Sequence, residues 1–265
     1  MIKMLVTDID GTLLRYDCSC SDYMKNTILK LNKKGVKVVL ASGRMFDGAY
    51  PVSQQFGLET PVICYQGAMV RDKDKILWQA PVKKDLVKDI IKTLKEENIH
   101  THLYNNDILY IDDYNKKIMD DYCNGRFVDY KIVDNLNNVE IGNVSKLLAV
   151  IYDEEKLVDL VRRMSEKYKD KLTVVRSHKY YCEFTDINAT KGVALDFLRE
   201  YWGFKKEEVM ASGDQDNDID LLLHAGLKIA MKNSSEGLKK VADYICPHVN
   251  EDGLAQAIER YILCE

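Results

Sequence analysis

Short apolar runs alternate with longer amphipathic segments over the first part of the chain. Residues 1–7, 36–41 and 61–65 are mostly apolar, and we expect them to form buried strands. Between the first two runs, apolar side chains recur at helical spacing from Ser21 or Asp22, either of which can cap a helix, to Gly35, which can end it. A strand, a helix and a strand at this spacing predict parallel pairing.

The same pattern returns near the end of the chain. A helix capped by Thr190 is expected to bury an apolar face, and residues 209–212 form a short apolar run after it. A second helix then ends at Gly226, and residues 227–231 and 244–246 predict two further strands. Both ends of the chain therefore predict one parallel α/β domain.

The middle of the chain follows a different pattern, with two expected hairpins at 102–111 and 172–184. Helices are expected at 86–94, 114–122 and 157–164, and strands at 127–133 and 147–152. This predicts an α+β module inserted into the α/β domain. We therefore expect a Rossmann-like parallel-sheet core formed by residues 1–83 and 188–265, and a cap domain formed by residues 84–187.

Composition narrows the classes of partner. The chain is 46% hydrophobic and 30% charged, with a formal net charge of −4, so no basic excess indicates binding to nucleic acid or to an anionic membrane. Its 7 cysteines are scattered and form neither a disulfide framework nor a zinc motif, which favours reduced thiols. No apolar run approaches the ~18 residues of a membrane span. We expect a cytoplasmic protein; the sequence leaves its oligomeric state open.

Two aspartates follow the first expected strand, where ligands of open α/β sheets bind. Asp8 and Asp10 are two positions apart, so in an extended segment both would project to one side. Mg²⁺ suits such an all-oxygen site and would relieve their repulsion. Asp8 could then attack phosphorus, while Asp10 could protonate the departing alkoxide and later activate water. The alternative is a solvated Asp-Gly turn.

Two further segments at a strand end or a helix start carry groups that suit a phosphate. The hydroxyl of Ser42 and the backbone N–H of Gly43 could bind phosphoryl oxygens, although serine and glycine are also common in turns. Lys191 opens the helix after Thr190, where the helix dipole does not favour a cation. It could face the phosphate and the nucleophile, or lie on the surface.

A second acidic cluster follows the strand at 209–212. Asp214 is the expected metal ligand, and Asn217 could bind a phosphoryl oxygen or orient the nucleophile. Asp218 could coordinate the metal through water or hold the lysine, while Asp216 is the expected bystander. Acidic residues also cap helices, which would account for at least one of them.

Taken in order, these motifs resemble those of the haloacid dehalogenase-like hydrolase superfamily. With the insert between the second and third motifs, the chain is similar to the Cof-type branch with a C2-type cap. The matching segments are Asp8-Ile9-Asp10-Gly11-Thr12, Ser42-Gly43-Arg44, Lys191-Gly192-Val193-Ala194-Leu195 and Gly213-Asp214-x-x-Asn217-Asp218. Gln66 departs from the asparagine usual in this branch, and so could alter a contact near the substrate.

The resemblance implies a phosphatase in which Asp8 is the nucleophile and Asp10 the general acid and base. Magnesium would bind Asp8, Asp10 through its backbone carbonyl, and Asp214. The resemblance further implies that the phosphate is contacted by Ser42, Gly43, Lys191 and Asn217. Arg44 is a further candidate for a phosphate contact. The substrate would be a small phosphorylated metabolite, such as a sugar phosphate.

Two other functions remain open at this point. A phosphomutase resembling phosphomannomutase would need a second phosphate site in the cap, for which Arg126, Arg162, Arg163 and Arg176 are available. A non-catalytic phosphate-binding protein is disfavoured by the intact catalytic motifs. Within the cap, Tyr181 and Glu183 could face the substrate or be ordinary sheet residues.

Overall fold

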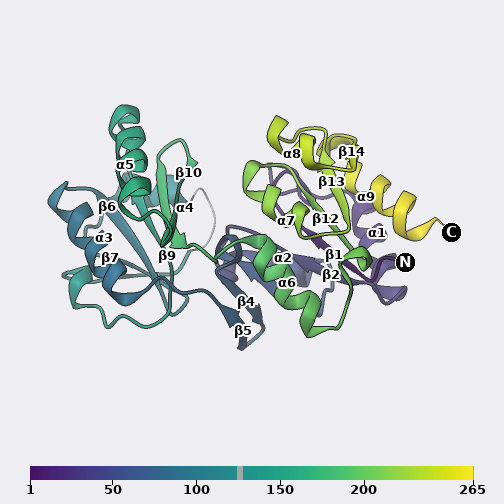
Figure 1. Cartoon of the computed structure of the whole chain (residues 1–265), viewed down its shortest axis with the longest axis horizontal. Helices are drawn as coiled ribbons and strands as arrows, with labels where there is room; N and C mark the ends of the chain where they lie inside the picture. Colours follow the sequence, from purple (N-terminus) through teal and green to yellow (C-terminus); the bar gives the residue numbers. More distant parts are fainter. Residues whose placement is uncertain (124–127, 265) are drawn as a thin grey trace. The chain divides into compact units, whose positions relative to one another are not determined.

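The computed structural model describes residues 1–123 and 128–264. The chain divides into two compact units, shown in Figure 1. The core unit comprises Met1–Trp78 and Thr190–Glu265, and the cap unit comprises Gln79–Ala189. The core unit is thus built from both ends of the chain.

A parallel sheet forms the centre of the core unit. Its strand order is β14-β13-β12-β1-β2, and every neighbouring pair is parallel. The strands are β1 (Met4–Thr7), β2 (Lys37–Leu40), β12 (Val209–Gly213), β13 (Leu227–Met231) and β14 (Tyr244–Cys246). Thr7 at the end of β1 pairs with Ser212 in β12, so loops about 200 residues apart in sequence leave the sheet side by side. The predicted α/β class is confirmed.

Helices cover both faces of this sheet. One apolar core joins the sheet to the helices α6 (Lys191–Tyr201), α7 (Ile219–Leu223) and α8 (Glu236–Val241). The helices α1 (Asp22–Lys33) and α9 (Gly253–Ile258) contact each other, and α1 packs on β2. Ser21 caps α1 by accepting a hydrogen bond from the Met24 N–H, and Thr190 caps α6 by accepting one from the Val193 N–H. Both predicted caps are confirmed.

The structure adds elements that the hydrophobic pattern missed. The third expected strand is β3 (Val62–Cys64). It meets the residue after β2 through one parallel bridge, between Ala41 and Ile63, and it also forms a three-stranded sheet with β4 (Met69–Asp72) and β5 (Lys75–Gln79). Helix α2 (Phe46–Gln55) was also missed, because Gly48 and Pro51 lower its helix propensity. Phe46, Ala49 and Val52 are nevertheless buried, so packing outweighs propensity there.

The cap unit contains a six-stranded sheet in the order β10-β11-β9-β6-β7-β8. Neighbouring strands in this order are antiparallel, except that β7 and β8 are parallel. The strands are β6 (His100–Asn105), β7 (Ile108–Ile111), β8 (Tyr130–Ile132), β9 (Val144–Val150), β10 (Leu172–His178) and β11 (Tyr181–Asp186). Both predicted hairpins are confirmed as β6–β7 and β10–β11.

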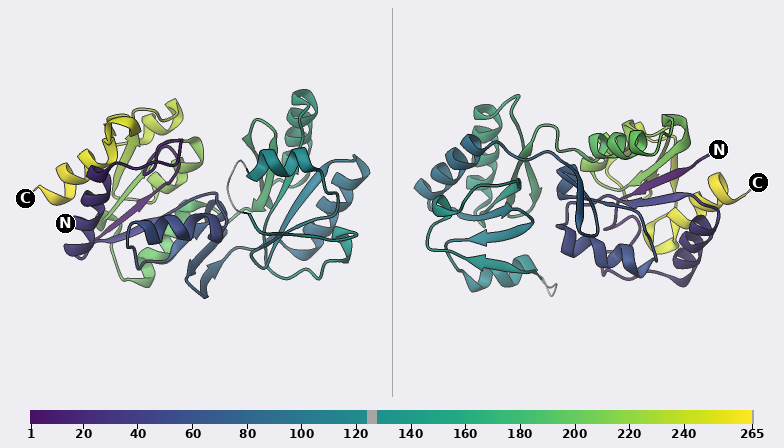
Figure 2. Two further views of the ribbon diagram at one scale, coloured as in Figure 1. Left: turned by 180° about the vertical axis from the view of Figure 1, so that it is seen from behind. Right: turned by 90° about the horizontal axis from the view of Figure 1, so that it is seen from below.

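Two amphipathic helices complete the apolar core of the cap unit. Helices α3 (Lys84–Glu96) and α5 (Glu154–Lys167) bury their apolar sides in one cluster with the sheet, on the same face in Figure 2. Helix α4 (Lys116–Cys123) lies where a helix over 114–122 was expected. The strand expected at 127–133 is shorter than predicted, and Phe127 lies outside the described residues.

Candidate active site

Three carboxylates gather where β1 and β12 end. Asp8 follows β1 directly and is 7% exposed, and its N–H donates to the carbonyl of Ser212 at 3.0 Å. Asp214 and Asp218 follow β12 and are fully buried. One oxygen from each of Asp8, Asp214 and Asp218 lies within 4.8 Å of the others. The parallel pairing of the two strands is therefore what brings these distant residues together.

Lys191 lies among these carboxylates. Its Nζ is 2.6 Å from Asp8 Oδ1 and 2.6 Å from Asp218 Oδ1, and its side chain is 0% exposed. It is the first residue of α6, where the helix dipole would favour an anion. The position of this lysine is thus explained by the two carboxylates it contacts, and the surface alternative is excluded.

Asp218 supports the site. Its Oδ2 accepts from the backbone N–H of Asp214 at 3.0 Å and from that of Gln215 at 3.1 Å, while Oδ1 accepts from Lys191. Both oxygens are thus engaged by the protein. Of the two roles left open by the sequence, holding the lysine is the one for which the structure shows a contact.

Asp214 is surrounded by hydroxyl and amide donors. Thr12 Oγ1 donates to Oδ1 at 3.0 Å, and Tyr16 OH and Gln215 Nε2 donate to Oδ2 at 2.9 and 2.8 Å. A Cβ at Gly11, whose φ is +87°, would lie 2.5 Å from Asp214 Oδ2 and 2.7 Å from the Tyr16 ring. Glycine is required there. The sequence did not predict a role for Tyr16, because no local pattern links this residue to Asp214 in the loop after β12.

The electrostatics of this site fit a bound divalent cation. Burial raises the pKa of Asp8; Lys191 lowers it, and the nearby Asp218 and Asp214 raise it again, with a net upward shift. Burial also raises the pKa of Asp214. Three buried carboxylates thus lie together, two of them in contact with one ammonium group, and their donor atoms are all oxygens. Such a donor set suits Mg²⁺, whose charge would allow both aspartates to stay ionised.

Asp10 lies apart from this buried group. Its side chain is 36% exposed, and both of its oxygens accept from the Arg44 guanidinium, with Nε to Oδ2 at 2.8 Å. Arg44 also donates from Nη1 to the carbonyl of Gly48 at 3.0 Å. The chain turns after Ile9 rather than staying extended, since the Leu14 N–H donates to the Ile9 carbonyl. Asp10 and Arg44 are therefore brought together as a bidentate pair.

The remaining candidates lie around the loop after β2. Ser42 is 2% exposed, and its Oγ accepts from the Arg44 N–H at 3.2 Å. Gly43 lies against the side chain of Gln66, whose Nε2 would be 2.5 Å from a Cβ at that glycine. The Oε1 of the same glutamine accepts from Asn217 Nδ2 at 2.8 Å. Gln66 thus bridges two segments expected to bind phosphate.

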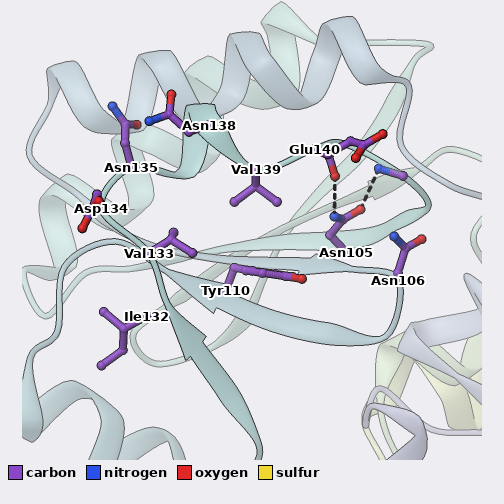
Figure 3. A pocket seen from close by; sticks show the side chains of 11 residues that line it. Asn105, Asn106, Tyr110, Ile132, Val133, Asp134, Asn135, Asn138, Val139 and Glu140 are labelled. Atoms are coloured by element: carbon purple, nitrogen blue, oxygen red, sulfur yellow. Dashed lines mark hydrogen bonds between the residues drawn. The ribbon is translucent and has the colours of Figure 1, made fainter.

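A separate hollow of about 710 Å³ lies within the cap unit (Figure 3). Its buried amide, Asn105, donates from Nδ2 to the carbonyl of Glu140 at 2.9 Å and accepts from the N–H of Gly142 at 2.9 Å. Both ends of this amide are thus used to hold the loop before β9, so we attribute its position to structure. Nothing in the hollow matches the carboxylate and ammonium chemistry of the core unit.

Comparison with known proteins decides the family. The family model described as haloacid dehalogenase-like hydrolase matches residues 5–258. The chain belongs to this family. A crystal structure of a Thermotoga maritima protein superposes with a TM-score of 0.88 at 35% identity, covering 98% of this chain and 97% of that one. The predicted resemblance is confirmed over nearly the whole length of the chain.

Two relatives of this chain are named as phosphatases. The 5-amino-6-(5-phospho-D-ribitylamino)uracil phosphatase YitU of Bacillus subtilis is 26% identical over 97% of each chain. The phosphatase YwpJ of the same organism is 24% identical over 98% of this chain and 100% of the relative. The prediction that this hydrolase is a phosphatase is thus confirmed. Across the described residues, no helix is both long and apolar enough to cross a membrane.

Proposed function

We propose that this phosphatase is Mg²⁺-dependent and hydrolyses a small phosphorylated metabolite through an aspartyl-phosphate on Asp8. The observation that carries the proposal is the position of Asp8. It is buried at the end of β1, hydrogen-bonded to Lys191 at 2.6 Å, and within one group of carboxylates with Asp214. A carboxylate nucleophile needs this combination of fixed geometry and nearby positive charge.

The first step is an in-line attack by Asp8 on the phosphorus atom. Lys191 holds Oδ1 of this carboxylate, which leaves Oδ2 to form the new O–P bond. The ester O–P bond breaks, and the departing alkoxide takes a proton from Asp10. Magnesium, when bound by Asp8, Asp214 and the Asp10 carbonyl, would supply positive charge that offsets the phosphate and the carboxylates.

The second step hydrolyses the acyl phosphate. Asp10, now ionised, accepts a proton from a water molecule as that water attacks phosphorus, and the bond to Asp8 breaks to release inorganic phosphate. Arg44 contacts both oxygens of Asp10 and so holds this carboxyl group in place. We place the phosphate contacts on the Ser42 hydroxyl, the Gly43 N–H and Lys191.

The cap is proposed to select the substrate. We take residues 84–187 as the cap and expect it to exclude water during turnover. A small metabolite agrees with the substrate named for the B. subtilis relative, which is a phosphorylated ribityl compound. Sugar phosphates are the class that we would test first.

The phosphomutase alternative gains no support from the described arginines. Arg163 pairs with Glu97 and Asp159, and Arg162 also pairs with Asp159. Arg176 donates to Glu154 at 3.1 Å. Arg126 lies outside the described residues. The arginines that the structure describes are thus neutralised by neighbouring acids rather than gathered into a second phosphate site.

Hydrolysis of p-nitrophenyl phosphate, with and without Mg²⁺, tests the proposal. We expect turnover that requires the metal and that Asp8→Asn abolishes. Asp216→Asn is the matched control, because Asp216 contacts Ser235 rather than the buried carboxylates. A panel of sugar phosphates would identify the substrate class, and isomerisation of a hexose phosphate without phosphate release would instead indicate a mutase. Full activity in Asp8→Asn would refute the proposed nucleophile.

A further inference from the structure

We infer that Gln66 donates a hydrogen bond to the substrate's phosphoryl group, and that Asn217 acts as the positioning residue for Gln66. This inference rests on the proposed function and reassigns one contact within it. Three features of the core unit support it: the backbone of the turn that carries Gln66, the orientation of its amide, and the segments that the turn touches.

The turn between β3 and β4 holds an unfavourable backbone conformation. Tyr65, Gln66 and Gly67 have φ values of 53°, 59° and 102° in succession. A left-handed conformation is unfavourable for a residue other than glycine, and such positions cluster at functional sites. Two consecutive non-glycine residues in this region therefore need support from their surroundings.

The surroundings of the turn are the two segments expected to bind phosphate. The Tyr65 N–H donates to the Arg44 carbonyl at 2.9 Å, and the Gln66 N–H donates to the Ser42 carbonyl at 3.0 Å. A Cβ at Gly67 would lie 2.1 Å from the main-chain carbonyl of Thr190, directly before Lys191. The turn is thus wedged between the loop after β2 and the first residues of α6.

The amide of Gln66 has its acceptor satisfied and its donor available. Oε1 accepts from Asn217 Nδ2 at 2.8 Å, which fixes the rotation of the amide. Nε2 is then directed to Gly43, 2.5 Å from where a Cβ would be. No acceptor for Nε2 is present among the described residues. A phosphoryl oxygen bound at the Gly43 N–H would therefore lie beside a fixed N–H donor of Gln66.

The same hydrogen bond explains what Asn217 does. One hydrogen of its Nδ2 is used to hold Gln66, and we therefore expect its effect on phosphate binding to pass through the glutamine. Removal of Gln66 should then make Asn217 irrelevant to phosphate affinity. Two independent phosphate contacts would instead lose affinity multiplicatively.

Titration calorimetry with inorganic phosphate, in the presence of Mg²⁺, tests this double-mutant cycle. A hydrogen bond to a charged group suggests that Gln66→Ala weakens phosphate binding by about 10-fold to 100-fold. Gln66→Met, which keeps the side chain's size, should lose the same affinity. Asn217→Ala should weaken binding in the wild type but by less than about 2-fold in the Gln66→Ala background. Gln54→Ala, an exposed glutamine on α2, is the control.

Two results would overturn the inference. Wild-type affinity in Gln66→Met would show that the amide donates nothing to phosphate. An equal loss from Asn217→Ala in both backgrounds would show that Asn217 binds phosphate itself. Failure of the proposed function is distinguishable, because it would appear as metal-independent or Asp8-independent turnover in the wild-type background.

Discussion

Replacement of Lys191 by methionine removes a buried charge while keeping most of the side chain's volume. Its Nζ lies 2.6 Å from both Asp8 Oδ1 and Asp218 Oδ1, and the Lys191 and Asp218 side chains are 0% and 1% exposed. Loss of one partner from a buried ion pair costs about 3–5 kcal/mol, because the other charge stays buried without compensation. We expect the free energy of unfolding of the metal-free core unit to fall by this amount.

Tryptophan fluorescence during urea denaturation, in EDTA, measures this loss in the correct unit. The chain has two tryptophans, and Trp78 and Trp202 both belong to the core unit. With an m-value of about 2 kcal/mol/M, a loss of about 3–5 kcal/mol would lower the urea midpoint by about 1.5–2.5 M. The cap unit does not contribute to this signal, so separate unfolding of the two units would not confuse the result.

Two variants make the result specific to the buried charge. Lys30→Met removes a lysine that is 57% exposed and 3.2 Å from Glu259, and exposed pairs contribute about 0–1 kcal/mol. In the double variant Lys191→Met/Asp218→Asn, the carboxylate that loses its lysine partner is also replaced by an amide. This variant should recover part of the free energy of unfolding that Lys191→Met loses. A midpoint for Lys191→Met equal to that of Lys30→Met would refute the reasoning.

Three further outcomes are expected. Asp10→Asn should slow p-nitrophenyl phosphate turnover by about 10²–10⁴-fold in stopped-flow assays, and an unchanged rate would exclude Asp10 from the mechanism. Gly67→Val should abolish folding of the core unit by circular dichroism, because its Cβ would meet the main chain at 2.1 Å; Gly57→Val, at a φ of +63° with no atom within 4 Å of the Cβ, should be tolerated far better. Lys146→Met should destabilise the cap unit by about 3–5 kcal/mol in hydrogen exchange, because it leaves Glu183, 9% exposed and 3.0 Å away, unpaired; protection equal to wild type would contradict this.

Local rules predicted the parts of the site that depend on strand ends and helix starts. Asp8 and Asp214 follow apolar runs that become β1 and β12, and the parallel pairing of such strands brings their ends together. Thr190 predicts the start of α6, and this places Lys191 at the first position of the helix. These predictions needed the hydrophobic pattern and one capping residue, both of which are local.

Contacts between loops could not be predicted in the same way. The sequence placed Arg44 with phosphate, and the structure pairs it with Asp10 through a turn that the alternation of strands does not specify. Tyr16 reaches Asp214 across 198 positions of sequence. Gln66 was noticed for its residue type, but its hydrogen bond with Asn217 depends on the left-handed turn. Such contacts are determined by loop conformation, on which periodicity carries no information.

The interruption of the core unit by the cap unit has a consequence during synthesis on the ribosome. Strand β1 emerges early from the ribosome. Its neighbour β12 follows only after the rest of the first core segment and the roughly 110 residues of the cap unit have been synthesised. At about 5–20 residues per second, that delay is on the order of ten seconds. The nascent chain carries Asp8 through this interval without Lys191 or Asp214, so the buried group of carboxylates and lysine is assembled late, whereas the uninterrupted cap segment is free to collapse first.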